Sequence, residues 1–115
     1  MKDEKLYIVH MLECAERILS YTQAGCNSFL HDLKTQDAVI RNFEIIGEAA
    51  KRVSQSVRDL APEIPWKQVA GFRDVLIHEY EGVDLGEIWK RVERDLPILL
   101  GALKKLLGRM ENQQG

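Results

Sequence analysis

The chain has 115 residues, of which 45% are hydrophobic and 30% are charged, and its formal net charge is −2. This length fits one domain with its own core, so we treat residues 1–115 as a single helical domain. The weakly acidic balance excludes a global basic field that would attract nucleic acid, so any such binding needs a local patch or a dimer. Cys14 and Cys26 lack partners at ligand spacing, so neither zinc nor another metal or cofactor is indicated.

The sequence also gives no sign of a membrane or secretory segment. No apolar run approaches the roughly 20 residues of a membrane span. The start Met-Lys-Asp-Glu carries three charged residues and no apolar run, which is unlike a signal peptide. We therefore expect a cytoplasmic protein that does not engage a membrane.

The first predicted helix covers residues 3–22, where apolar side chains recur at steps of three and four. The stripe consists of Ile8, Leu12, Ala15, Leu19 and Thr22, widened by Met11 and Ile18. Gly25 and Asn27 then interrupt the pattern, and residues 28–32 fit one short extra helix.

The second predicted helix begins at a cap formed by Thr35 and has the most regular stripe of the chain. Its apolar positions step by four and three and are Val39, Phe43, Ile46, Ala50, Val53 and Val57. Gly47 and Ala50 are small, so a neighbouring helix can approach closely there.

Two more helices complete the pattern. Pro65 suits the first position of the third helix, Gly82 ends it, and Asp84 can cap the fourth. The fourth helix has an apolar stripe reaching residue 110, with an expected kink at Pro97 and a frayed tail over residues 111–115. Four long helices with short connections predict an all-α, antiparallel four-helix bundle with one short extra helix.

Four chemically versatile side chains lie close together near the end of the third helix: Arg73, Asp74, His78 and Tyr80. Arg73 and Tyr80 fall on one helical line, and Asp74 and His78 fall on another. Arg73 and His78 are roughly 140° apart around a straight helix, so one helix cannot easily aim both at one atom. Either the backbone turns near His78, or a second copy of the chain completes the site.

This cluster has two interpretations. In the first it is a solvated helix surface, with His78 as a C-terminal cap stabilised by the helix dipole. In the second it cleaves RNA without a metal: a ribose 2′-hydroxyl attacks the adjacent phosphate, His78 transfers the proton, and Arg73 stabilises the charge developing on the phosphate oxygens. Asp74, one turn before His78, would fix its tautomer.

The run Arg-Asp-Val-Leu-Ile-His-Glu-Tyr at residues 73–80 resembles a family motif: arginine, four residues, histidine, any residue, tyrosine. It is the motif of the HepT-like proteins of the HEPN superfamily. Residues 35–52 look like that family's second helix, and residues 62–66, 82–85 and 95–97 are similar to its connecting segments. The resemblance covers most of the chain in matching order.

The resemblance implies the HEPN-like helical bundle and the toxin half of a toxin–antitoxin pair, a metal-independent endoribonuclease whose homodimer lines one cleft. Arg73 and His78 would be catalytic, and Asp74 would take the place of the supporting polar residue. Tyr80 would be silenced by AMPylation by a cognate MntA-type nucleotidyltransferase, since its modification would put negative charge beside Arg73. This chain lacks the Gly-Ser and Asp-x-Asp signature of such a transferase. Glu81 replaces the aromatic residue common in relatives and bears on cleavage strength.

Some assignments stay open. On the second helix Arg41, Glu44 and Glu48, with Arg52, form either a solvated face with ion pairs or the wall of an RNA or dimer cleft. His10 and His31 have no companions at ligand spacing and are interpreted as ordinary surface or partly buried residues. The alternative function is a non-catalytic helical scaffold that binds a nucleotidyltransferase.

Overall fold

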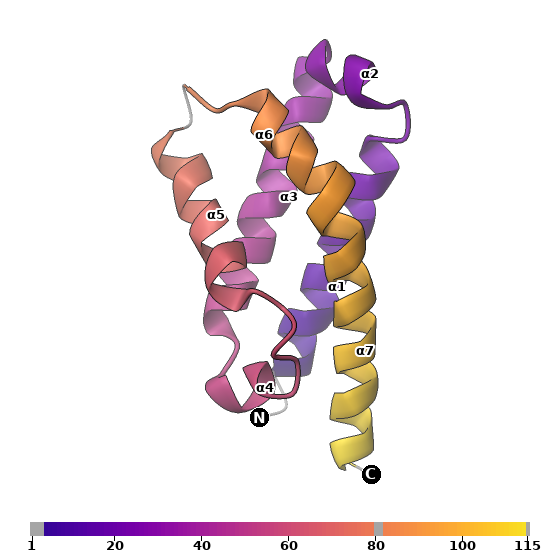
Figure 1. Cartoon of the computed structure of the whole chain (residues 1–115), viewed down its shortest axis with the longest axis vertical. Helices are drawn as coiled ribbons and strands as arrows, with labels where there is room; N and C mark the ends of the chain where they lie inside the picture. The colour runs from indigo at the N-terminus through magenta and orange to yellow at the C-terminus, as the bar shows by residue number, and fades with distance from the viewer. Residues whose placement is uncertain (1–3, 80–81, 115) are drawn as a thin grey trace.

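The computed structural model describes residues 4–79 and 82–114, and all regular structure within these ranges is helical. The α-helices and one π-helical segment appear in Figure 1 in chain order. They are α1 (Glu4–Tyr21), α2 (Cys26–Leu30), α3 (Leu33–Arg52), α4 (Gln55–Arg58), α5 (Trp66–His78), α6 (Leu85–Lys90), η1 (Arg91–Asp95) and α7 (Leu96–Gln114).

The long elements alternate in direction. In Figure 1, α1 and α5 run upward, while α3 and the continuous α6–η1–α7 rod run downward. Helix α3 packs against α1 and also against α5, and α7 packs against α1. The predicted antiparallel four-helix bundle is therefore confirmed, with short helices added between the long ones.

The core lies where the apolar stripes of the long helices meet. All six side chains of the stripe predicted on the second long helix are buried, but α3 ends at Arg52, so Val53 and Val57 lie beyond it, Val57 in α4. The stripe on α1 is centred differently from the prediction, because Met11, Cys14 and Ile18 are fully buried while Leu12 and Leu19 are partly exposed. The extra apolar positions thus decide which face of α1 points inward.

The start of α3 differs from the prediction. The helix begins at Leu33, and Asp32 rather than Thr35 occupies the N-cap position, with extended backbone angles. The Thr35 hydroxyl donates a hydrogen bond of 2.7 Å to the Asp32 carboxylate, and this bond holds the pKa of Asp32 below its ordinary value. A side chain that can cap a helix can equally serve in its first turn, so the spacing alone did not fix the boundary.

The last helix departs from regular geometry just before the proline. Asp84 caps α6 as predicted, accepting hydrogen bonds from the backbone N–H groups of Gly86 and Glu87. The next segment, η1, is π-helical, and the Leu96 N–H donates to the carbonyl of Arg91, five residues earlier. Pro97 follows at once and cannot donate a backbone hydrogen bond. Figure 1 shows the rod changing direction between α6 and α7, so the irregularity expected at Pro97 is spread over the turn before it.

A close approach between α3 and α5 positions the helix that carries the motif. A Cβ at Gly47 would lie closer to the Arg73 Cβ than real Cβ atoms come to their neighbours, and 3.2 Å from the carbonyl oxygen of Val69. Glycine at this position lets α5 lie directly on α3. The predicted close approach is confirmed at Gly47, and its partner is the backbone turn that carries Arg73.

Candidate active site

Helix α5 carries the motif and ends inside it. His78 is its last residue, and the N–H of the following Glu79 donates to the carbonyl of Val75 at 2.9 Å. The backbone therefore turns near His78, which is one of the two alternatives that the sequence left open. Tyr80, the predicted AMPylation site, and Glu81, which was expected to bear on cleavage strength, lie outside the described residues.

The Arg73 guanidinium is held by carboxylates from two helices. Its Nε lies 3.5 Å from the Glu48 carboxylate on α3, and one terminal nitrogen lies 3.3 Å from Asp74 Oδ1. The side chain is 27% exposed, so part of the guanidinium still faces solvent. The planar fork is therefore oriented before any ligand arrives.

Asp74 engages α3 rather than the histidine. Its Oδ1 accepts a 2.8 Å hydrogen bond from Lys51, and this bond is the main cause that holds the pKa of Asp74 below its ordinary value. Its hydrogen bonds to described residues go to Lys51 and Arg73, and His78 is not among these partners. Lys51 was missed by sequence reasoning, because its role depends on the helix crossing and not on any spacing within one helix.

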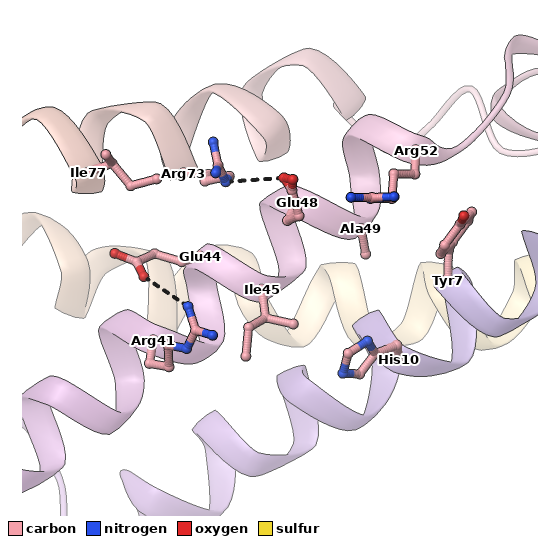
Figure 2. Close-up of a pocket in the computed structure, with 10 residues that line it drawn as sticks. All are labelled: Tyr7, His10, Arg41, Glu44, Ile45, Glu48, Ala49, Arg52, Arg73 and Ile77. Carbon is pink, nitrogen blue, oxygen red and sulfur yellow. Dashed lines mark ion pairs between the residues drawn. The ribbon is translucent and has the colours of Figure 1, made fainter.

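Arg73 lines a hollow of about 330 Å³ between three helices. Figure 2 shows the side chains that surround it. They come from α1 (Tyr7 and His10), α3 (Arg41, Glu44, Ile45, Glu48, Ala49 and Arg52) and α5 (Arg73 and Ile77). The α3 members follow steps of three and four, so they form one stripe along that helix.

The hollow is locally positive in a chain whose net charge is negative. It contains three arginines and two glutamates. Arg41 pairs with Glu44 at 3.6 Å and Arg73 pairs with Glu48, and Figure 2 marks both pairs. Arg52 forms no ion pair with any described residue. The predicted cleft residues Arg41, Glu44 and Glu48 thus share one hollow with Arg73.

His78 is exposed and does not line this hollow. A single chain therefore presents the guanidinium of Arg73 in the hollow and the imidazole of His78 outside it. The five-residue separation on α5 produces this arrangement, because the two side chains leave the helix in different directions.

Tyr7 and His10 of α1 were not predicted as site residues, whereas Arg52 of α3 belonged to the face for which a cleft wall was one of two alternatives. Sequence reasoning treated His10 as an ordinary histidine, and its ring borders the same hollow as Arg73. Tyr7 and His10 are three residues apart, which places them on one face of α1. That spacing was the available signal, but only the packing of α1 on α3 brings the face to the site.

Two kinds of feature are absent from residues 4–79 and 82–114. No group of three or more His, Cys, Asp or Glu side chains there is arranged to hold a metal ion. No helix in the described part of the chain combines the length and apolar character needed to cross a bilayer.

Comparison with known proteins identifies the family. Residues 11–106 match the family described as ribonuclease HepT-like. A protein of Thermococcus cleftensis named "Probable ribonuclease HepT" is 46% identical over 91% of this chain and 96% of its own length. A Methanocaldococcus jannaschii protein, described as a gamma-glutamylcyclotransferase and candidate RNase, is 41% identical over 98% of this chain but only 51% of its own length.

A candidate RNase of Caldanaerobacter subterraneus subsp. tengcongensis is 35% identical over 93% of this chain and 96% of its own length. No solved structure matches the chain. The family match spans most of the chain and includes α3, α5 and the Arg73–His78 motif. The chain therefore belongs to the HepT-like ribonuclease family.

Proposed function

We propose that this chain is a metal-independent endoribonuclease, the toxin of a toxin–antitoxin pair. The observation that carries the proposal is the Arg73 guanidinium, oriented by Glu48 and Asp74 and facing a locally positive hollow. A guanidinium fixed in this way can bind a phosphate without first losing its side-chain freedom. The names of the relatives as ribonucleases support RNA as the substrate class.

The proposed chemistry is transfer of the phosphate within the RNA strand. The ribose 2′-oxygen bonds to phosphorus, the bond from phosphorus to the 5′-oxygen breaks, and the product carries a cyclic phosphate. One histidine takes the 2′-hydroxyl proton and another donates a proton to the leaving oxygen. Arg73 stabilises the charge that develops on the phosphate oxygens.

A homodimer fits this chemistry better than one chain. Within one chain His78 lies outside the hollow that contains Arg73. A second copy can bring its own His78 to that hollow, and a paired site supplies the two histidines that the two proton transfers need. Ile77, 42% exposed on the same helix and bordering the hollow, gives the dimer apolar surface to bury.

Regulation is proposed at Tyr80, two residues after His78. AMPylation of its hydroxyl by a MntA-type nucleotidyltransferase would add a negatively charged phosphodiester to the motif, and this charge would compete with RNA for the Arg73 guanidinium. Co-expression with such a transferase should add adenylyl groups to the wild type and none to Tyr80→Phe, as mass spectrometry would show.

The scaffold alternative also has an observation in its favour, because Glu44 and Glu48 already occupy two of the arginines. Expression of the chain alone separates the two functions. A ribonuclease toxin arrests growth and cleaves purified RNA, and His78→Ala abolishes both effects while the variant stays folded and dimeric. Harmless expression with no cleavage by the purified wild type would favour the scaffold.

A further inference from the structure

The hollow continues along α3 beyond Arg73 to a group that the proposed cleavage chemistry does not use. The group consists of Tyr7, His10 and Arg52. Figure 2 shows Arg52 and Tyr7 at one end of the hollow with His10 beside them, while Arg41 lies at the other end. We call these three residues the Arg52 group. Its place in the same hollow makes it available to any ligand that reaches Arg73.

Helical register places Arg52 one step beyond Arg73. Glu48 marks the level of Arg73 along α3, because its carboxylate lies 3.5 Å from the Arg73 Nε. Arg52 follows Glu48 by four residues, about 6 Å along the helix axis. One nucleotide advances a flexible strand by a comparable distance. Arg52 therefore lies beyond the level of Arg73 along α3 by about the spacing of successive phosphates.

The charge of Arg52 is the least neutralised in the hollow. Arg41 and Arg73 each have a glutamate partner, whereas Arg52 has none among the described residues. His10 adds ring nitrogens that can donate to a phosphate oxygen. Tyr7 is partly buried and adds an aromatic ring, the kind of surface on which an unpaired base stacks.

We propose that the Arg52 group is a subsite for the nucleotide next to the cleaved bond: Arg52 and His10 bind its phosphate, and Tyr7 stacks on a base. The proposal rests on the proposed function and narrows its substrate to unpaired RNA. A base that is free of pairing can reach the Tyr7 ring, while a base inside a duplex stays stacked on its neighbours.

Salt-dependent binding tests the subsite without cleavage. The probe is a fluorescent single-stranded oligonucleotide with 2′-O-methyl riboses, which has no 2′-hydroxyl to attack. For single strands, the slope of log affinity against log salt falls by about 0.7 for each phosphate that the protein no longer neutralises. Arg52→Gln should lower the slope by this amount and weaken binding roughly tenfold at low salt. Tyr7→Leu should weaken binding roughly tenfold with the slope unchanged.

Two matched variants keep the result specific. Arg94→Gln removes an exposed arginine of η1 that lies outside the hollow, so its slope should equal that of the wild type. Arg52→Lys keeps the charge and should keep the slope. The subsite is overturned if Arg52→Gln retains the wild-type slope, or if Arg94→Gln lowers the slope as much. Equal affinity for a duplex of the same sequence would overturn the assignment to unpaired RNA.

Failure of the subsite and failure of the proposed function give different results. Cleavage of the same sequence with ordinary riboses is measured separately for the wild type and His78→Ala. Cleavage that depends on His78, with no change of slope in Arg52→Gln, removes the subsite and keeps the ribonuclease. A changed slope without any cleavage by the wild type keeps the phosphate site and removes the ribonuclease.

Discussion

Two hollows of similar size lie beside α5, one lined by charged side chains and the other mainly by apolar side chains. The polar hollow of about 330 Å³ contains Arg73, while a groove of about 350 Å³ between α3, α5, η1 and α7 is lined mainly by apolar side chains. Neighbouring residues of α5 serve the two sides. Arg73 lines the polar hollow and Phe72 lines the apolar groove, because consecutive side chains leave a helix about 100° apart.

The comparison shows how the rotation of α5 is fixed. On the apolar side, the Phe72 ring packs edge-on against Phe43 with centroids 5.2 Å apart, and the Arg91 guanidinium lies 5.4 Å from the centroid of the Phe72 ring. Gly47 allows the backbone contact between the two sides. The aromatic contacts thus orient the helix that presents Arg73. Phe72 contributes the packing, and the adjacent Arg73 contributes the charged group of the site.

The largest expected effect is on the polar side. Arg73→Met keeps the aliphatic stem against Gly47 but removes the guanidinium, so cleavage should fall about 100- to 1,000-fold. The free energy of unfolding should change by no more than about 1 kcal/mol, because ion pairs of partly exposed groups contribute little. Cleavage assays and urea unfolding measure the two effects. Arg41→Met, at the exposed rim, should reduce activity far less, and equal reductions would contradict the assignment of Arg73.

Phe72→Ala should show the reverse pattern. Removing the ring enlarges the apolar groove and removes its packing contacts, so the free energy of unfolding should fall by about 2–3 kcal/mol. Val75→Ala, on the exposed side of α5, should change it by less than about 0.5 kcal/mol. Urea unfolding compares the two variants. A Phe72→Ala protein as stable as Val75→Ala would mean that the apolar groove does not hold α5.

Gly47→Ala tests the contact between the two sides. Alanine favours helix formation by about 1 kcal/mol over glycine, but here its Cβ must displace the Arg73 turn, so a net destabilisation of about 1–2 kcal/mol is expected. Gly108→Ala on α7 meets open space and should instead stabilise by about 0.5–1 kcal/mol. Thermal unfolding of the two variants measures the difference, and stabilisation in both would show that α5 does not lie tightly on α3.

Much of this fold could be predicted because the stripes are regular. The steps from Val39 to Ala50 predict a buried face of α3, and that face is buried. The boundaries were less certain, since Asp32 and Thr35 can both serve at a helix start and their mutual hydrogen bond leaves Asp32 at the cap. Periodicity reports which face is buried and says little about where the first turn begins.

Only part of the site could be predicted from the sequence. The positions of Arg73 and Asp74 on one helix follow from the sequence run, but Lys51 and His10 reach the site from other helices. Their positions depend on how α3 crosses α5 and how α1 packs on α3, which no local spacing encodes. The expected link from Asp74 to His78 also assumed a partner on the same helix, and the Asp74 carboxylate found a stronger donor across the helix crossing.

The smallest expected effect concerns that crossing pair. Lys51→Met removes the hydrogen bond that is the main cause of the lowered pKa of Asp74, so this pKa should rise toward its ordinary value. Because the folded pKa lies below the unfolded one, the ion pair with Lys51 stabilises the protein above the unfolded value, and this stabilisation disappears as the pH falls through the folded value. Lys51→Met should therefore lose less stability on acidification than the wild type.

NMR titration of the Asp74 carboxyl carbon checks this directly, with Lys104→Met as the control, since Lys104 is exposed on α7 and away from the hollow. An unchanged Asp74 pKa in Lys51→Met would show that Arg73, and not Lys51, keeps the pKa of that carboxyl group low. Asp74 would then neutralise the guanidinium that the polar hollow presents. A raised pKa would instead show that Lys51 shares the charge of Asp74 and leaves more of the positive charge of Arg73 available to a phosphate.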